Sequence, residues 1–179
     1  GGLTKALERG RQVIEAMKAK IAVDPVPVPF AKLKLGLKCG SSDTTQGLSA
    51  NVIVGRITDI FAAAGASVVM GETTEFMGAE HIAAAHCVSD EVGRTIGDKV
   101  ARMEARARAV GVDMRGGQPT RGNIAGGLTT IEEKSLGALA KAGSAVFQRV
   151  ISYGKNVEQP GLVMMDAPGR EPEMLTGLA

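Results

Sequence analysis

Three polar, glycine-rich segments hold most of the side chains in this sequence that could carry out chemistry. They are residues 39–47, residues 71–81 and residues 111–127. In open α/β sheets, ligands bind outside the carboxyl ends of strands, in loops that lead into helices. Each segment is expected to be a loop of that kind, so all three are candidate site segments.

The first segment contains Cys39, Ser42 and Asp43 and leads into a predicted helix. Free N–H groups at a helix start, with hydroxyls beside them, suit a carboxylate or a phosphate. The pattern is neither a Walker A motif nor GxGxxG. A capped turn with Cys39 as a small buried side chain explains the segment equally well.

The second segment places Glu72, Glu75, Glu80 and His81 close together in the chain. Carboxylates and an imidazole are able to bind a divalent ion or to move protons. Alternatively, Glu80 is a first-turn helix acid and His81 an ordinary polar residue. His86 lies five positions further, about 140° around a helix, so the two histidines do not form a metal-binding pair, and His86 and Cys87 are interpreted as packing residues.

The third segment carries Arg121 and Asn123, which suit a carboxylate or a polyol, and Lys134 follows in the first turn of a predicted helix. The lysine would act as an acid or base, or as a cation beside a substrate. An ordinary loop with Glu132 and Glu133 as capping residues is the alternative. Three such segments at one sheet edge make that alternative less favoured.

Hydrophobic periodicity predicts the elements that position these segments. An amphipathic helix over Thr4–Lys20 and a proline-rich connector over Asp24–Phe30 form an N-terminal part, residues 1–30. Strands and helices alternate over residues 31–179, which predicts a three-layer, Rossmann-like α/β domain with a mostly parallel sheet. The strands are expected at Leu33–Leu37, Ala66–Met70, Ala145–Ser152 and Gly161–Asp166, and the helices at Val52–Ala64, Ala79–Val88, Ser89–Val110 and Thr130–Ala142.

The amino-acid composition excludes several classes of protein and of partner. Hydrophobic residues are 44% and charged residues 22% of the 179, which excludes a disordered chain and a coiled coil. Residues 1–38 carry a net charge of +5 (8 basic, 3 acidic) and the remainder −3 (13 basic, 16 acidic). With only 3% aromatic residues, the basic segment is interpreted as a solvated helix, so no nucleic-acid partner is expected. No apolar stretch is long enough for a membrane partner.

Cysteine usage and the chain start give two further expectations. Cys39 and Cys87 form no CxxC motif, and no signal peptide is evident, which favours a reducing cytoplasm. The chain begins Gly-Gly rather than with Met, so we expect it to be a piece of a longer protein.

Four separated motifs carry a family resemblance. They are residues 36–43 (GLKCGSSD), 71–81 (GETTEFMGAEH), 122–137 (GNIAGGLTTIEEKSLG) and 163–169 (VMMDAPG). In this order they resemble the altronate dehydratase / D-galactarate dehydratase family, which includes the large subunit of sulfolactate sulfo-lyase. The similarity runs from Leu33 onward and covers the middle part of a typical member. Members commonly read Cys-Gly-Gly-Ser-Asp at 39–43, and an aromatic residue with a Gly-Ser pair at 44–47.

The resemblance implies a hydro-lyase that dehydrates a sugar acid to a 2-keto-3-deoxy acid with a divalent metal, generally iron(II). A sulfo-lyase acting on sulfolactate and a non-catalytic anion- or nucleotide-binding module are the alternatives. The family's N- and C-terminal domains would be partners, so this piece alone is expected to be inactive. The sequence leaves open whether it forms a homo-oligomer. The candidate site residues are Cys39, Glu72 and His81 for the metal, Lys134, Asp43 and Glu75 for catalysis, and Ser42, Arg121 and Asn123 for substrate.

Overall fold

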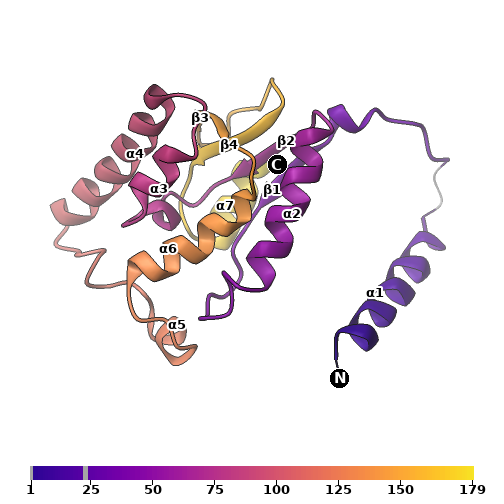
Figure 1. The fold of residues 1–179 in the computed structure, drawn as a ribbon, viewed down its shortest axis with the longest axis horizontal. Helices are drawn as coiled ribbons and strands as arrows, with labels where there is room; N and C mark the ends of the chain where they lie inside the picture. Colours follow the sequence, from indigo (N-terminus) through magenta and orange to yellow (C-terminus); the bar gives the residue numbers. More distant parts are fainter. Residues whose placement is uncertain (1, 22–23) are drawn as a thin grey trace.

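Four short strands form one parallel sheet in the computed structural model, which describes residues 2–21 and 24–179 (Figure 1). The strands are β1 (Lys34–Leu37), β2 (Ser67–Met70), β3 (Phe147–Ser152) and β4 (Gly161–Asp166). Their order is β1-β2-β4-β3, and every neighbouring pair is parallel. The predicted parallel sheet is confirmed, and the carboxyl ends of β1, β2 and β4 therefore meet at one edge.

Side-chain alternation along the central strands builds a core on each face of the sheet. Val68 and Met70 of β2 point into the larger cluster, whereas Val69 points into the smaller one. All four residues of β2 are buried, as expected for a parallel strand covered on both sides. Two packed faces need two helical layers.

Four of the described helices cover the sheet face that carries the larger cluster, and one covers the opposite face. This arrangement confirms the three-layer α/β fold (Figure 1). The helices of the larger face are α2 (Ala50–Ala63), α3 (Glu80–Ala85), α4 (Asp90–Ala109) and α6 (Ile131–Leu139). Helix α7 (Glu171–Leu178) packs on the other face through Met174, which is fully buried. The sequence prediction missed α7, because its apolar residues are few and interrupted by Pro172 and Gly177.

Two helices are capped by Ser89 and Thr130, the residues at which the sequence predicts these helices to start. The Ser89 hydroxyl accepts from Val92 N at the start of α4. At α6, Glu133 N donates to Thr130 Oγ1 at 3.1 Å. The Glu133 carboxylate accepts from Thr129 N at 2.8 Å, one residue earlier than in a standard capping box.

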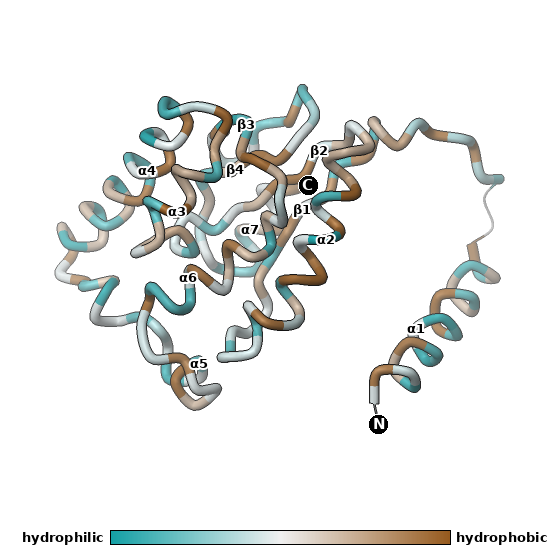
Figure 2. The backbone as a smooth tube through the Cα atoms, in the orientation of Figure 1, coloured by the Kyte–Doolittle hydropathy of each residue, from teal (hydrophilic) through white to brown (hydrophobic). Residues whose placement is uncertain are grey.

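Helix α2 buries a different face from the one its apolar stripe suggests. Figure 2 shows hydrophobic segments along α2. Val52, Ile53 and Ile60 are nevertheless about half or more exposed, whereas Gly55 and Thr58 are buried. A Cβ at Gly55 would lie 2.3 Å from Ala140 O, so α2 approaches the short 3-10 helix Ala140–Ala142 through its smallest residue. Backbone-to-backbone approach at Gly55 decides this contact, and Val54 and Phe61 pack beside it against the larger core cluster.

Helix α1 (Leu3–Lys18) confirms the expected N-terminal helix and has no buried residue. Figure 1 shows it away from the sheet. Three shorter elements, absent from the sequence prediction, are the 3-10 helices Phe30–Lys32 and Thr73–Phe76 and helix α5 (Arg121–Ala125). Across residues 2–21 and 24–179, no helix has the length and apolar character that crossing a bilayer requires.

The contact at Gly55 gives a stability prediction. Gly55→Ala is expected to lower the free energy of unfolding by about 1–3 kcal/mol, because the new methyl group meets backbone atoms that cannot rotate away. Gly97→Ala, inside α4 with open space around its Cβ, should raise it by about 0.5–1 kcal/mol. Urea unfolding of both variants measures the difference, and equal effects would contradict the close approach of α2.

Candidate active site

A cavity of about 480 Å³ opens at the carboxyl edge of the sheet. Its walls come from the loops after β1, β2 and β4 and from the segment that contains α5 and the start of α6. The residues that line it are Lys38, Cys39, Gly40, Ser41, Ser42, Glu72, Thr74, Glu75, Gln118, Thr120, Asn123, Ile131, Lys134, Gly169 and Arg170. This is the place where open parallel sheets bind ligands.

The turn after β2 brings two glutamates to this cavity. Gly71 permits the close approach of α7, because a Cβ there would lie 1.8 Å from the Met174 methyl group. Glu72 then adopts a left-handed conformation with φ of 62°, which is unusual for a residue other than glycine. The 3-10 helix Thr73–Phe76 follows and turns Glu75 inward. Backbone strain of this kind is typical of functional sites.

Glu72 ties the loop after β2 to the loop after β1. Its carboxylate accepts from Lys38 Nζ at 2.8 Å and from Cys39 N at 2.9 Å. Burial, followed by the negative charge of Glu75, raises the pKa of Glu72 above its usual value, and the bond from Lys38 opposes that shift. A carboxyl group with a raised pKa is better suited to exchange protons near neutral pH.

Cys39 lies between these acids and the Ser42 hydroxyl. Its Sγ is 3.2 Å from Ser42 Oγ. Burial, with the charge of Glu75 next in importance, raises the pKa of the Cys39 thiol above its ordinary 9.0. The thiol is therefore neutral at physiological pH.

Glu75 forms a buried ion pair with Lys141, and both side chains are at most 3% exposed. Oxygen Oε2 accepts from Lys141 Nζ. The other oxygen, Oε1, is buried and has no hydrogen-bond partner among the described residues. A buried acceptor without a partner is costly unless a ligand or another group satisfies it.

Sequence reasoning missed Lys141. The available signal was a lysine inside the otherwise apolar run Leu136-Gly-Ala-Leu-Ala-Lys-Ala142. The structure shows why it lies there: Thr58 Oγ1 donates to Lys141 O at 2.8 Å, so α2 holds the short helix that carries the lysine. Lys141 itself is not among the residues that line the cavity, whereas Lys38, Thr74, Gln118 and Arg170 line it and were not among the predicted site residues.

Lys134 is oriented by a polar network. Its Nζ donates to Asn123 Oδ1 at 3.2 Å and to Gln118 Oε1 at 3.3 Å. Asn123 is buried, and its Nδ2 donates to Ser42 O at 2.9 Å. Asn123 therefore connects the loop after β1 to α5 and α6, and it places the Lys134 ammonium at the cavity wall.

Six of the nine sequence-predicted residues line this one cavity: Cys39, Ser42, Glu72, Glu75, Asn123 and Lys134. Asp43 lies outside it, because its carboxylate accepts from Thr45 N and Thr45 Oγ1 at 2.7 Å each. Those hydrogen bonds lower the pKa of Asp43 and make it part of the loop turn. Arg121 is exposed at the start of α5 and does not reach the cavity.

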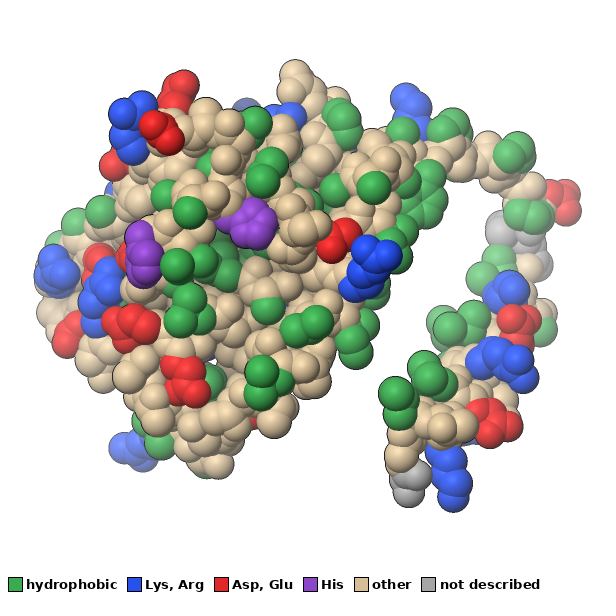
Figure 3. Space-filling model, viewed as in Figure 1, with side chains coloured by type: hydrophobic (Ala, Val, Ile, Leu, Met, Phe, Trp, Pro, Cys, Tyr) green, Lys and Arg blue, Asp and Glu red, His purple; other side chains and the backbone are tan. Residues whose placement is uncertain are grey.

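His81 is the third residue that the structure does not bring to the cavity. It is exposed on α3 and lines a shallow depression with Glu80 and Asp90. Figure 3 shows both histidines of the chain at the surface. Of the candidate site residues Cys39, Asp43, Glu72 and His81, only Cys39 and Glu72 line this cavity, and His81 does not because α3 turns it away.

The residues present do not by themselves make a complete metal site. Within the part of the chain that the structure describes, no group of three or more His, Cys, Asp and Glu side chains is arranged to hold a metal ion. Glu72 and Glu75 are each bound to a lysine. Cys39 and the unpartnered Glu75 Oε1 remain as potential ligands, so further ligands would have to come from outside this set.

The same four motifs that resemble a known family form the walls of this cavity or the strands leading to it. A model of the family described as D-galactarate/altronate dehydratase, C-terminal, matches residues 30–179. The chain belongs to this dehydratase family. The match includes every strand of the sheet and every residue that lines the cavity.

Relatives with curated names support the assignment of the chain to this family. The chain is 40% identical over 154 residues to the (2R)-sulfolactate sulfo-lyase subunit beta of Chromohalobacter salexigens, which covers 84% of this chain and 39% of that protein. It is 37% identical to the altronate dehydratase of Escherichia coli, over 86% of this chain and 31% of the relative. The altronate dehydratase of Bacillus subtilis is 35% identical, over 94% of this chain and 34% of the relative. The chain thus spans about a third of its relatives' length.

The environment of Cys39 gives a reactivity prediction. The pKa of its thiol is raised above 9.0. The rate of alkylation by iodoacetamide should therefore be low at pH 7 and should still increase with pH around pH 9. Peptide mass spectrometry follows Cys39 and Cys87 separately. In urea the two cysteines should react at similar rates, which serves as the control, and a rate that levels off below pH 8 would contradict the raised pKa.

The buried ion pair gives a second prediction for this site. Lys141→Met is expected to destabilise the chain by about 3–5 kcal/mol, because it leaves the Glu75 charge buried and unpaired. The double variant Lys141→Met/Glu75→Gln should recover most of that loss, since no buried charge remains. Denaturant unfolding of the single and double variants checks this, and additive losses would show that the pair is not a unit.

Proposed function

We propose that this chain forms the acid–base half of the active site of a sugar-acid dehydratase that converts a substrate of the altronate or galactarate type to a 2-keto-3-deoxy acid. The observation that carries the proposal is the convergence of the family motifs on one polar cavity. Two buried glutamates, a neutral thiol and three cationic side chains face the same space there. The cavity volume suits a small polar molecule.

The reaction needs three contributions that such a wall supplies. A base removes the proton on the carbon next to the carboxylate. Positive charge stabilises the enediolate that forms, and an acid protonates the hydroxide that leaves the neighbouring carbon. The resulting enol then becomes the 2-keto acid, so atoms balance as substrate to product plus water.

The geometry favours particular residues for these steps. Lys38, Lys134 and Arg170 supply the positive charge for the substrate carboxylate and for the enediolate. Lys134 is held at the wall by Asn123 and Gln118, and we assign it the proton transfer. Glu75 Oε1 is the acceptor without a partner and is the second candidate for proton exchange. Ser42 and Asn123 shape the wall around the substrate.

The proposal places this activity in a longer enzyme. The chain covers between 27% and 39% of the length of its curated relatives, so further regions would complete the substrate pocket. We also propose that the enzyme uses a divalent metal, with iron(II) as the preferred candidate, which would act as a Lewis acid on the substrate carboxylate. No step is assigned to it, because the described side chains alone do not complete its ligand set.

Elimination of sulfite from sulfolactate is the second candidate function. The supporting observation is the 40% identity to a sulfolactate sulfo-lyase subunit. The chemistry is related, since a base again removes the proton beside a carboxylate while a group leaves the neighbouring carbon. The cationic wall of Lys38, Lys134 and Arg170 suits a sulfonate as well as a carboxylate.

Activity assays test the proposal. The longer enzyme that contains this chain, supplied anaerobically with iron(II), should form a 2-keto-3-deoxy acid from altronate or galactarate, whereas the chain alone should form little or none. Lys134→Met in the longer enzyme should lower kcat by about 10²–10⁴-fold, as expected for loss of a proton-transfer group. Lys155→Met, an exposed lysine in the β3–β4 loop, is the matched control and should leave kcat unchanged.

Sulfolactate is assayed in parallel with the same variants. Sulfite release without keto-acid formation would replace the first function by the second. No product from any of the three substrates would overturn both and favour a binding module. Unchanged kcat in Lys134→Met would contradict the role assigned to that lysine while leaving the family assignment intact.

A further inference from the structure

A second cavity of about 480 Å³ lies on the other side of the turn that carries the glutamates. Its walls include Lys99, Arg102 and Arg106 of α4, Tyr153 after β3, and Thr73 and Asp166. Thr73 faces this cavity, whereas the next residues, Thr74 and Glu75, line the candidate active site. The two cavities are therefore separate neighbours.

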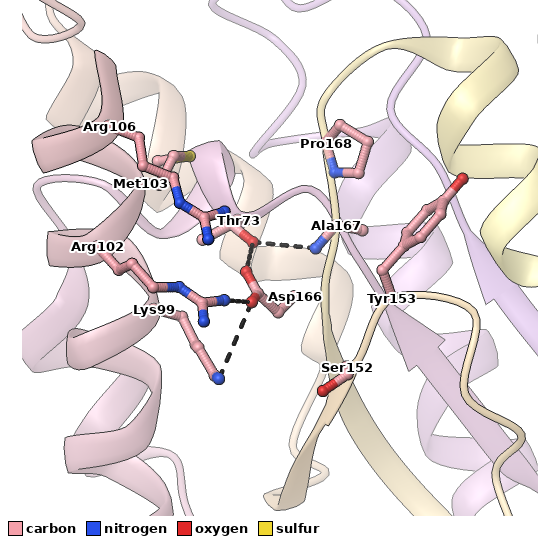
Figure 4. A pocket seen from close by; sticks show the side chains of 10 residues that line it. All are labelled: Thr73, Lys99, Arg102, Met103, Arg106, Ser152, Tyr153, Asp166, Ala167 and Pro168. Carbon is pink, nitrogen blue, oxygen red and sulfur yellow. Dashed lines mark hydrogen bonds and ion pairs between the residues drawn. The ribbon is translucent and has the colours of Figure 1, made fainter. Parts of the chain in front are cut away.

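Positive charge is concentrated in the second cavity. Lys99, Arg102 and Arg106 come from successive turns of α4 and point toward Asp166 and Thr73 (Figure 4). Asp166 is the one acidic side chain among the described residues that line it. This excess of cations stands out, because residues 39–179 as a whole carry a net charge of −3 (13 basic, 16 acidic).

The cations are only partly neutralised. Asp166 pairs with Arg102, and Lys99 Nζ lies 3.9 Å from Asp166 Oδ2. Arg106 forms no ion pair with any acidic side chain that the structure describes. Asp166 is itself held in place, since its Oδ1 accepts from Thr73 Oγ1 at 3.0 Å. One carboxylate thus faces three positive side chains in one concave space, in which Arg102 and Arg106 keep exposed surface that a ligand can reach.

We propose that this cavity is a binding site for a small oxyanion, either a phosphate ester or a carboxylate, distinct from the candidate active site. The two guanidinium groups present the paired N–H donors that bind such oxygens in two-point fashion, and Lys99 adds a third charge. The volume exceeds that of a bare phosphate, so it accommodates the organic part of the ligand beside Tyr153 and Met103. The site lies at the carboxyl ends of β3 and β4, where the sheet favours ligands.

Calorimetric titration of this 179-residue chain tests the proposal at low ionic strength, with inorganic phosphate, ribose 5-phosphate and succinate as probes. We expect at least one probe to bind, and added salt to weaken the binding. Arg102→Gln should raise Kd about tenfold or more, as expected for the loss of a charge-assisted hydrogen bond. Preference for the phosphate probes or for succinate identifies which kind of oxyanion the site takes.

Four further variants separate this site from simpler explanations. Asp166→Asn should lower Kd, because it removes the negative charge and keeps an oxygen acceptor for Thr73. Arg108→Gln, on the same helix but outside the cavity, should leave Kd unchanged. Lys155→Met, an exposed lysine in the β3–β4 loop that lines neither cavity, should also leave it unchanged, whereas weaker binding in Lys134→Met would show that the probe occupies the candidate active site.

Several results would overturn the proposal. Absence of binding by every probe would do so, as would equal weakening by Arg102→Gln and Arg108→Gln, which would indicate a general charge effect. Loss of binding in Lys134→Met alone would move the anion to the candidate active site. Circular dichroism of each variant establishes that it is folded, and the opposite sign expected for Asp166→Asn cannot arise from unfolding.

Discussion

The ion pair between Glu75 and Lys141 is the constraint on which the candidate active site depends. Both side chains are almost fully buried, so neither charge is tolerated without the other. Lys141 reaches Glu75 only because Gly55 lets α2 approach the 3-10 helix Ala140–Ala142, and because Thr58 binds the Lys141 carbonyl oxygen. The packing of a surface helix therefore influences the electrostatics of the cavity, where one buried carboxylate oxygen of Glu75 has no hydrogen-bond partner among the described residues.

The sheet order explains why acids and cations share one edge. With β1, β2 and β4 side by side and parallel, the turns that follow them lie next to one another. Glu72 binds across two of these turns, to Lys38 and to Cys39 N. The narrow 3-10 helix Thr73–Phe76 then divides the edge into two cavities with different character, one containing acids and lysines and one dominated by α4 cations. This one short turn therefore contributes residues to both cavities.

The departures from the family motifs fall at different distances from the cavity. Ser41, where members commonly have glycine, lines it. Thr44 instead donates its backbone N–H to Gly126 O at 3.1 Å and fastens the loop to the end of α5. A changed side chain at Ser41 is therefore in a position to influence which substrate binds, whereas Thr44 acts on the loop that carries Ser42.

The parallel α/β fold, the approximate strand positions, the helix starts at Ser89 and Thr130 and six of the residues that line the cavity were all predictable from the sequence. These follow from local rules: periodicity, capping chemistry and the fact that ligands gather at strand ends. The positions of His81, Asp43 and Arg121 outside the cavity, and the ion pair of Lys141 with the cavity residue Glu75, come from the packing of the folded chain. Those outcomes depend on which face of a helix is buried and on the close backbone approach at Gly55. Both features bring together residues that are far apart in the chain, so local sequence patterns carry little sign of them.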